Sequence, residues 1–383
     1  STYHMALTVL FRILFIAYGE DKDLLPYRTN DLYRARSFKQ KATDLLKIRE
    51  DATGFDAHSY SHWDDAVRLF EAVNRGSREL GVPLYNGGLF SEDPEVSPTG
   101  ATLSSLRLSN SDFGPVLTYI LVDESEEGVG PVDFRSLGVR EFGTIYEGLL
   151  ESELSIAETD LTVDSKGAYK PANKEDPEVQ SGEVYIHNKS GARKATGSYF
   201  TKAFAVDHLL DHSLEPALNE HVARLEALDE VEAGKSFFDF RVADIAMGSG
   251  HFLVAAVDRI ERRLQQYLSD RPLPVVIDEL ARLRTSATET LGSLAEGTDI
   301  EDTTLLRRQI ARRCIYGVDL NPVAVELARV SLWIHTFVPG LPLSMLDHHL
   351  VEGNSLVGIG TLEEAQELVS KAAGGPLFNV FVE

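Results

Sequence analysis

Helical and strand-like segments alternate along the chain from Ala195 to its end. The strand-like segments are short and apolar, and the segments between them space their apolar residues as a helix does. This alternation predicts an α/β fold with a doubly wound, mostly parallel sheet that has helices on both faces. The expected elements are helix Ala203–Asn219, strand Phe237–Ala246, helix His251–Leu268, strand Ile315–Leu320, helix Pro322–Thr336, strand His349–Leu356 and helix Leu362–Lys371.

The chain before residue 193 has a different pattern. Residues 1–151 are expected to form a mainly helical N-terminal domain. Residues 152–192 are expected to form a connector with a β-hairpin, because the apolar stretches Leu154–Ala157 and Glu183–His187 flank a polar segment. Residues 193–383 then form the α/β domain. The helices expected in the first domain are Met5–Tyr18, Asp31–Arg49, His62–Leu80 and Phe134–Glu151.

Composition restricts the function. The net charge of −23 argues against this chain holding DNA by itself, because phosphate contacts need clustered Lys and Arg. The chain has a single cysteine, Cys314, which excludes an internal disulfide and is consistent with a reducing cytoplasm. The apolar neighbours of Cys314 predict that it is buried and does not act as a nucleophile. The apolar stretch Met5–Tyr18 is interrupted by Arg12, and we expect it to be a buried helix and neither a membrane span nor a secretory signal.

The strongest local signal is a strand that leads through a glycine turn into a helix, Val242-Ala243-Asp244-Ile245-Ala246-Met247-Gly248-Ser249-Gly250-His251-Phe252. Glycines lack a Cβ atom, so the backbone can bend sharply and a ligand can approach it closely. Nucleotide-like ligands bind at the carboxyl end of the first strand in doubly wound sheets. A purely structural turn is the alternative. The residues of the turn expected at a ligand are Asp244, Ala246, Gly248, Ser249, Gly250 and Phe252.

Two later strand ends have the same character. Asp319 and Leu320 follow the apolar stretch Ile315–Val318, and a carboxylate there can accept hydrogen bonds from both hydroxyls of a ribose. The alternative role for Asp319 is to cap the next helix. Asn354 and Ser355 follow the third strand, where the Asn354 carbonyl oxygen can accept from the amine of an adenine ring, although such residues are also common in turns.

A fourth segment, Ala195–Thr201, places aromatic and hydroxyl side chains in a turn just before a helix. The aromatic faces of Tyr199 and Phe200 can cover a ligand, and a hydroxyl can bind its amino-acid end, but the two rings can equally be core residues. The candidate ligand-binding residues in this segment are Thr196, Tyr199, Phe200 and Thr201.

Taken in order, these four segments resemble the cofactor motifs of gamma-order DNA methyltransferases that act on adenine N6. The similarity is greatest to the large enzymes of type IIG restriction–modification and of related phage-defence systems. Two N-terminal phrases, Tyr85–Phe90 (YNGGLF) and Gly143–Leu150 (GTIYEGLL), are similar to the helical region of those proteins. The resemblance implies a Rossmann-like methyltransferase sheet, S-adenosylmethionine as the cofactor and double-stranded DNA as the partner.

Two departures from the family pattern stand out. A long charged stretch, Arg259–Arg313, separates the cofactor motif at Asp244 from the one at Asp319, as an insertion would. The family's catalytic sequence, Asn or Asp followed by Pro-Pro and an aromatic residue, does not occur in these 383 residues. We therefore expect a domain that stops before its catalytic motif, so that the sheet is incomplete and these residues bind cofactor without transferring a methyl group.

The resemblance also implies that most DNA contacts lie in parts of the parent protein beyond this sequence, and that defence-system subunits are possible partners. No membrane and no metal enter this hypothesis. Three alternatives remain. A nicotinamide-dependent oxidoreductase would have Gly-x-Gly-x-x-Gly, whereas Leu253 stands at the third glycine position here. The others are a noncatalytic interaction protein that retains the fold, and a restriction endonuclease fused to the methyltransferase.

Overall fold

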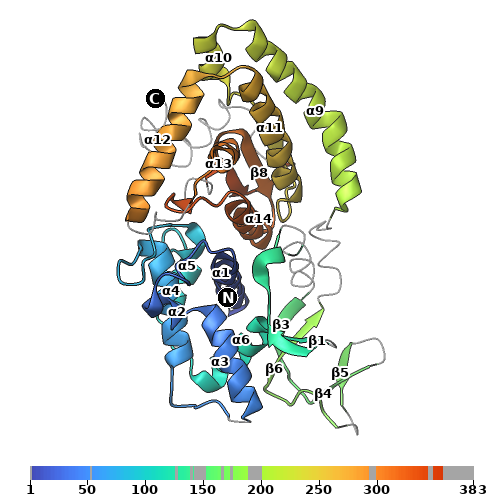
Figure 1. Cartoon of the computed structure of the whole chain (residues 1–383). Coiled ribbons are helices and arrows are strands. Elements are labelled where there is room, and N and C mark those ends of the chain that lie inside the picture. The colour runs from blue at the N-terminus through green and yellow to red at the C-terminus, as the bar shows by residue number, and fades with distance from the viewer. Residues whose placement is uncertain are drawn as a thin grey trace, which may run out of the picture.

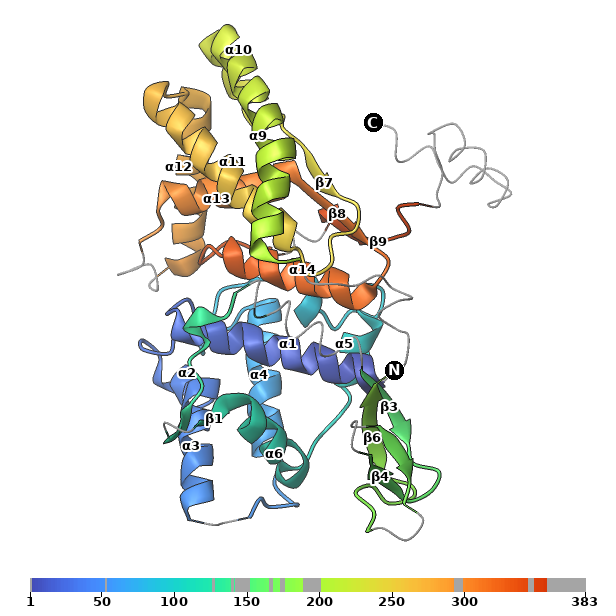
Figure 2. The same cartoon turned by 90° about the vertical axis from the view of Figure 1, so that its right-hand side faces the viewer.

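The computed structural model combines helices, short antiparallel ladders and a three-stranded parallel sheet (Figure 1, Figure 2). In both views the early helices lie at one end of the molecule and the parallel sheet with its helices at the other. The structure is thus a mixed α/β arrangement. It describes residues 2–51, 54–125, 128–138, 141, 152–164, 168–172, 176–188, 201–292, 299–343 and 348–356.

Helices account for most of the first 121 residues, but two predicted helices are broken or shortened. The helix predicted over 31–49 is broken, because the Ser37 hydroxyl accepts from the Gln40 amide and starts a new helix there. The helix predicted to reach Leu80 ends at Arg75, where Gly76 takes a φ of +76°. The elements are α1 (Thr2–Asp21), α2 (Asp31–Arg34), α3 (Phe38–Glu50), α4 (Ser61–Arg75), the 3-10 turn η1 (Gly88–Phe90), α5 (Pro98–Leu103) and α6 (Asn110–Leu121).

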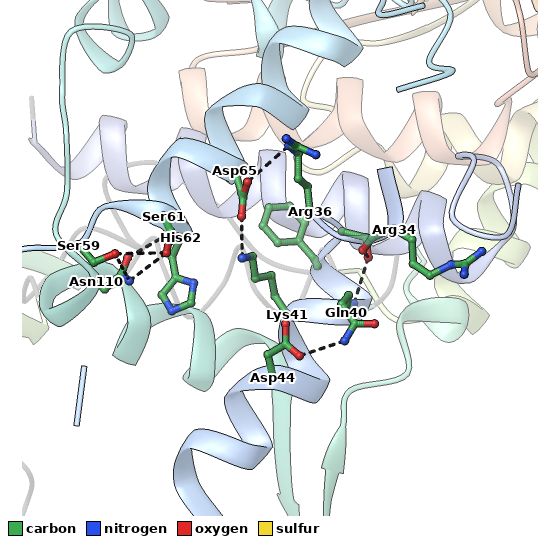
Figure 3. A network of polar contacts seen from close by, with 12 residues as sticks. Arg34, Arg36, Gln40, Lys41, Asp44, Ser59, Ser61, His62, Asp65 and Asn110 are labelled. Carbon is green, nitrogen blue, oxygen red and sulfur yellow. Dashed lines mark hydrogen bonds and ion pairs between the residues drawn. The ribbon is translucent and has the colours of Figure 1, made fainter. Parts of the chain in front are cut away.

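Polar side chains join α4 to its neighbours (Figure 3). Asp65 on α4 accepts from the Lys41 ammonium group on α3 at 2.7 Å and also pairs with Arg36 at 3.6 Å. At the start of α6, the side-chain oxygen of Asn110 accepts a hydrogen bond from the His62 backbone amide at 3.0 Å. Lys41 and Asn110 are both buried, so these contacts satisfy polar groups that would otherwise be costly to bury.

Helix α1 is longer than predicted. By length and composition alone it could cross a membrane, although half of its most apolar window is buried inside the protein. Phe11 and Phe15 are each 2% exposed, and the buried Arg12 guanidinium donates to the Leu89 carbonyl at 2.8 Å and the Ser91 carbonyl at 3.3 Å. Helix α1 is therefore a core helix here, and its arginine binds the loop that contains η1.

The chain after α6 departs from the prediction. Strands β1 (Val122–Ser125) and β2 (Gly128–Pro131) form an antiparallel ladder that the sequence analysis did not identify. The helix predicted over 134–151 starts instead as a 3-10 turn, η2 (Phe134–Ser136), after which Leu137 is extended. The rest of that predicted helix, from residue 142 onward, lies outside the described residues.

The connector contains two antiparallel ladders. Strands β3 (Ser152–Ile156) and β6 (Val184–Asn188) pair with each other, in agreement with the two predicted strands. Between them, β4 (Leu161–Val163) and β5 (Tyr169–Pro171) form a second antiparallel ladder, which was not predicted because this segment is polar. Buried Leu161 and Val179 and the packed rings of Tyr169 and Tyr185, 4.8 Å apart, give this segment a small core of its own.

In the α/β region the order of helices and strands agrees with the prediction, but the first and third strands are shorter. Residues 237 and 238 form a turn directly after a helix, whereas their apolar side chains had suggested that the strand begins there. Both Phe237 and Phe238 are buried in that turn. The predicted helix over 362–371 lies outside the described residues. The elements are α9 (Ala203–Ala227), α10 (Glu230–Ser236), β7 (Val242–Asp244), α11 (His251–Asp270), α12 (Pro274–Leu291), α13 (Asp302–Cys314), β8 (Ile315–Asp319), α14 (Pro322–His335) and β9 (Leu350–Glu352).

The three strands are parallel, in the order β7-β8-β9. Helix α11 packs against β7 and β8, and α14 packs against β8 and β9. The connections from β7 to β8 and from β8 to β9 each lead to the next strand in the same direction across the sheet. Connections between parallel strands are right-handed, so α11 and α14 lie on the same face of the sheet. The expected cover on both faces is therefore not present in the described part of the chain, where Val351 of β9 is 44% exposed.

The helical region and the α/β region share one hydrophobic core. Phe15 of α1 packs edge-on against Trp333 of α14, with ring centroids 6.4 Å apart. The Tyr85 ring lies 5.1 Å from that of Phe337, and the Tyr85 carbonyl accepts from the Leu343 amide at 2.6 Å. The position of α14, which follows β8, is thus set partly by the N-terminal helices.

Candidate functional site

The carboxyl ends of the three parallel strands meet at one edge of the sheet. Strand β7 ends in Asp244, β8 ends in Asp319 and β9 ends in Glu352. In the strand register Asp319 lies opposite Glu352, and Asp244 lies opposite Gly317. This edge therefore gathers three acidic residues from distant parts of the sequence, and it is where ligands bind in open parallel sheets.

The turn after β7 uses its two glycines differently. Gly248 has a φ of +53°, and a Cβ atom added there would meet nothing within 4 Å. Gly250 has a φ of +85°, and an added Cβ would lie 3.2 Å from the Cα and Cβ atoms of Ala328 on α14. Gly250 is thus required for close packing of α11 against α14, whereas Gly248 leaves open space above the turn.

Asp319 is held by backbone amides from two segments. Its Oδ2 atom accepts from the Gly248 amide at 2.9 Å, and its Oδ1 atom accepts from the Asn321 amide at 2.8 Å. The cap of α14 is Asn321, whose side chain accepts from the Val323 amide at 2.9 Å. The structure therefore removes the capping alternative for Asp319, and its carboxylate is instead bound to the glycine turn.

The charge of Asp319 acts on Asp244. The pKa of Asp244 is raised, first by its burial and also by the negative charge of Asp319, although a 3.0 Å hydrogen bond from the Ala246 amide opposes the shift. In the strand register Asp244 lies opposite Gly317, two residues before Asp319, so the two carboxylates lie at the same edge of the sheet. Together they make this part of the edge favourable for a positively charged ligand and unfavourable for a phosphate.

The other predicted residues of these two turns vary in exposure. Ser249 is 6% exposed, and Phe252 is half-buried at the start of α11. Ala246 is exposed beside the turn, and Leu320 is 55% exposed directly after Asp319. An exposed leucine next to the carboxylate offers apolar surface to a flat ring. Ser249 is turned into the protein and is the least accessible of the set.

The third predicted segment lies next to the second. The Gly353 amide donates to the Asp319 carbonyl at 2.9 Å, which brings the turn after β9 to the end of β8. Asn354 and Ser355 are exposed, and the Asn354 side-chain oxygen accepts from the Leu356 amide at 2.9 Å. That oxygen thus closes a local turn.

Of the fourth predicted segment, Thr196, Tyr199 and Phe200 lie outside the described residues. Thr201 is half-buried, and its backbone forms a hydrogen bond with the His251 side chain. Burial lowers the pKa of His251, and this hydrogen bond opposes the shift. Thr201 therefore lies beside the start of α11. His251 was not predicted as a site residue, although its position directly after the glycine turn indicates that it lies near the site.

Other chemistry has little support in this structure. Within residues 2–356, gaps excepted, no group of three or more His, Cys, Asp or Glu side chains is arranged to hold a metal ion. Cys314 is buried, and burial raises the pKa of its thiol to about 12, so it is not a nucleophile at neutral pH. This agrees with the structural role predicted from its apolar neighbours.

Comparisons with known proteins give one informative similarity. No protein-family model matches the chain. No solved structure matches it. The chain is similar to a protein of Methanocaldococcus jannaschii that is provisionally named a type II restriction enzyme and methyltransferase, with 23% identity over 378 residues. The match covers 92% of this chain but 27% of that protein, so the chain spans about a quarter of its relative's length. The chain is thus a distant relative of a restriction–modification methyltransferase over almost all of its own length.

Proposed function

We propose that the edge formed by Asp244, Gly248 and Asp319 binds S-adenosylmethionine, and that the chain is part of a DNA methyltransferase. One observation carries the proposal: the Gly248 amide donates to the Asp319 carboxylate, so the first two predicted cofactor motifs meet in one turn. The distant similarity to a restriction–modification methyltransferase supports the same class of activity. The proposal keeps the division into a helical region (1–151), a connector (152–192) and a Rossmann-like, doubly wound cofactor domain (193–383).

The residues present fit the proposed cofactor. A carboxylate offers about four lone-pair sites. The amides of Gly248 and Asn321 use one site on each oxygen of Asp319, which leaves one site on each for the two ribose hydroxyls. The open space above Gly248 lets a ligand reach the backbone, and Leu320 can pack against the adenine ring. The Thr201 backbone forms a hydrogen bond with His251 at the start of α11, and we expect Thr201 to contribute to closing the site.

Charge favours S-adenosylmethionine over a dinucleotide. When bound, the cofactor supplies a methyl group on a positively charged sulfonium centre. The carboxylates of Asp244 and Asp319 attract such a cation and hold the cofactor in place, and they repel the pyrophosphate of a nicotinamide dinucleotide. The residues of this chain would thus bind and orient the donor, while hydrogen bonds at Asp319 fix the ribose.

The methyl acceptor in this proposal is adenine N6 in double-stranded DNA, in a restriction–modification or phage-defence system. It rests on the family resemblance of the four motifs. With a net charge of −23, the chain is expected to leave most phosphate contacts to other parts of the protein or to partner subunits. The sequence lacks Asn/Asp-Pro-Pro-aromatic, so we expect cofactor binding without methyl transfer by these residues alone. A noncatalytic scaffold or a fused endonuclease would share this cofactor domain.

Calorimetric titration of the 383-residue protein with S-adenosylmethionine and, separately, with NAD tests the proposal. We expect saturable binding of S-adenosylmethionine and at least tenfold weaker binding of NAD. Equal or tighter binding of NAD, or no binding of S-adenosylmethionine, would reject it. Incubation with radiolabelled methyl donor and duplex DNA should give no labelled DNA, and turnover would contradict the expectation that these residues do not suffice for catalysis.

A further inference from the structure

A cavity of about 700 Å³ lies where the helical region meets the α/β region. Helices α1 and α14 lie side by side there in both views (Figure 1, Figure 2). The wall is formed by α1, by the loop of residues 86–99, and by α14 with the ends of β9. Asp244, Gly248 and Asp319 are not among its lining residues. Glu352, which lies opposite Asp319 in the strand register, is one of them, so the cavity adjoins the proposed cofactor site but does not include its glycine turn or Asp319. Its polar lining includes His4, Thr8, Asn86, Glu326, His348 and Glu352.

Asn86 is held in an unusual conformation at this cavity. Its φ of +45° lies in the left-handed region, which non-glycine residues rarely adopt. Both neighbours are fixed: Tyr85 is fully buried against Phe337, and a Cβ atom on Gly87 would lie 3.2 Å from the Trp333 ring. The exposed Asn86 side chain lines the cavity. Strained residues of this kind persist mainly where the side chain has a use.

The charges around the cavity favour an amine over a phosphate. The Arg329 guanidinium is occupied, because it pairs with Glu326 and donates to the Leu350 carbonyl at 2.8 Å. Glu352 has an exposed carboxylate and no ion pair with any residue that the structure describes. The wall therefore carries an excess negative charge, which attracts hydrogen-bond donors and repels anions.

The inner surface suits a flat ring. Leu7, Phe11 and Leu89 line the cavity and are 5%, 2% and 3% exposed, so its floor is apolar. The carboxamide of an asparagine pairs a donor with an acceptor, which matches the N7 acceptor and N6 amine of adenine. A volume of about 700 Å³ lies within the range of ordinary small-molecule sites.

We propose that this cavity binds the adenine base of an unphosphorylated nucleoside, with Asn86 reading the N6–N7 edge and Glu352 excluding phosphates. The site goes beyond the proposed cofactor function and does not depend on it. The same base chemistry is also present in a DNA strand, but the negative wall favours the free nucleoside over a nucleotide with phosphates on both sides.

Equilibrium dialysis of the 383-residue protein with labelled adenosine tests this site, in an Asp319→Ala background that weakens the proposed cofactor site. In this background we expect one adenosine per chain, at least tenfold weaker binding when Asn86→Gly is added, and unchanged binding when the exposed control Glu95→Gln is added. Glycine accepts the positive φ, so Asn86→Gly should melt at the same or a higher temperature. This variant therefore removes the carboxamide without a loss of folding.

Two further arms identify the ligand source. Adenosine monophosphate and a short single-stranded oligonucleotide should each bind at least tenfold more weakly than adenosine, and Glu352→Gln should reduce that difference for the monophosphate. The proposal is overturned if no adenosine binds, if Asn86→Gly binds as tightly as the wild type, or if phosphates do not weaken binding. If Asp319→Ala by itself abolishes adenosine binding, the adenosine belongs to the cofactor site and the proposal is overturned. Failure of the cofactor proposal would appear separately, as S-adenosylmethionine binding that Asp319→Ala does not weaken.

Discussion

The Gly248 amide and the Asp319 carboxylate, 71 residues apart in sequence, are joined by a 2.9 Å hydrogen bond. The bond connects the turn after β7 to the end of β8. Because the Asn321 amide binds the other oxygen of Asp319, the carboxylate is fixed in direction before any ligand arrives. Preorganisation of this kind lowers the entropic cost of binding.

The two glycines of the turn should separate stability from binding. Gly250→Ala places a Cβ atom 3.2 Å from Ala328 at a φ of +85°, and we expect it to lower the free energy of unfolding by about 2 kcal/mol. Gly248→Ala meets no atom within 4 Å and should cost about 1 kcal/mol, for its φ of +53° alone.

Urea denaturation and calorimetric titration of both variants check this difference. Gly248→Ala should weaken S-adenosylmethionine binding at least tenfold, because its methyl group occupies the space above the turn. A Gly248→Ala variant with wild-type affinity would show that the ligand does not approach this part of the backbone.

Asp244 should make stability depend on pH. Its pKa is raised by burial and by Asp319, so the folded state favours the protonated carboxyl. The stabilisation that the protonated Asp244 contributes is fully present below the ordinary pKa of an aspartate. It is lost as the pH rises through the raised pKa of the folded state. Asp244→Asn keeps an oxygen for the Ala246 amide and carries no charge, so it should be more stable than the wild type at pH 7.

Denaturant unfolding of both proteins from pH 4 to pH 8 measures this effect. The advantage of Asp244→Asn should grow as the pH rises. An advantage that is absent at pH 7, or that does not change with pH, would contradict the proposed repulsion between Asp244 and Asp319.

Glu20 should produce a second pH effect, in the helical region. Burial raises the pKa of this fully buried carboxyl from 4.5 to about 7, although hydrogen bonds from Lys39, Tyr33 and Phe38 oppose the shift. Its contribution to stability is complete below about pH 4.5 and is lost as the pH rises through about 7.

The Glu20→Gln variant isolates this contribution. We expect its stability relative to the wild type to rise between pH 5 and pH 8, by a few kcal/mol in total, as measured by denaturant unfolding. Glu95→Gln, at an exposed position, serves as the control. A constant difference between Glu20→Gln and the wild type over this range would mean that Glu20 is ionised throughout.

The sequence predicted well the features that depend on local pattern. The boundaries of α11 and α14 follow from apolar spacing and from Pro322 at the start of its helix, and the structure reproduces them to within two residues. The expected neighbourhood of Asp244 and Asp319 follows from parallel pairing, which brings strand ends to one edge. Whether these residues bind a cofactor stays a prediction.

Features set by long-range packing were not predictable. Phe237 and Phe238 resemble strand residues, but they are buried in a turn. The Phe238 carbonyl oxygen accepts a hydrogen bond from the thiol of Cys314, at the end of α13. The side chain that caps α14 belongs to Asn321 and not to Asp319, because Gly248 engages the aspartate from a distant segment. Sequence spacing contains no information on such contacts.

The affinity of Asp319→Ala for S-adenosylmethionine tests the central claim most directly. Calorimetry should show a loss of roughly 1.5–3 kcal/mol, which is about 10- to 150-fold in dissociation constant, because charged hydrogen bonds to the ribose are removed. Glu220→Ala, at an exposed position on α9, should bind like the wild type. Wild-type affinity in an Asp319→Ala variant that is folded would contradict the proposal that this carboxylate holds the cofactor.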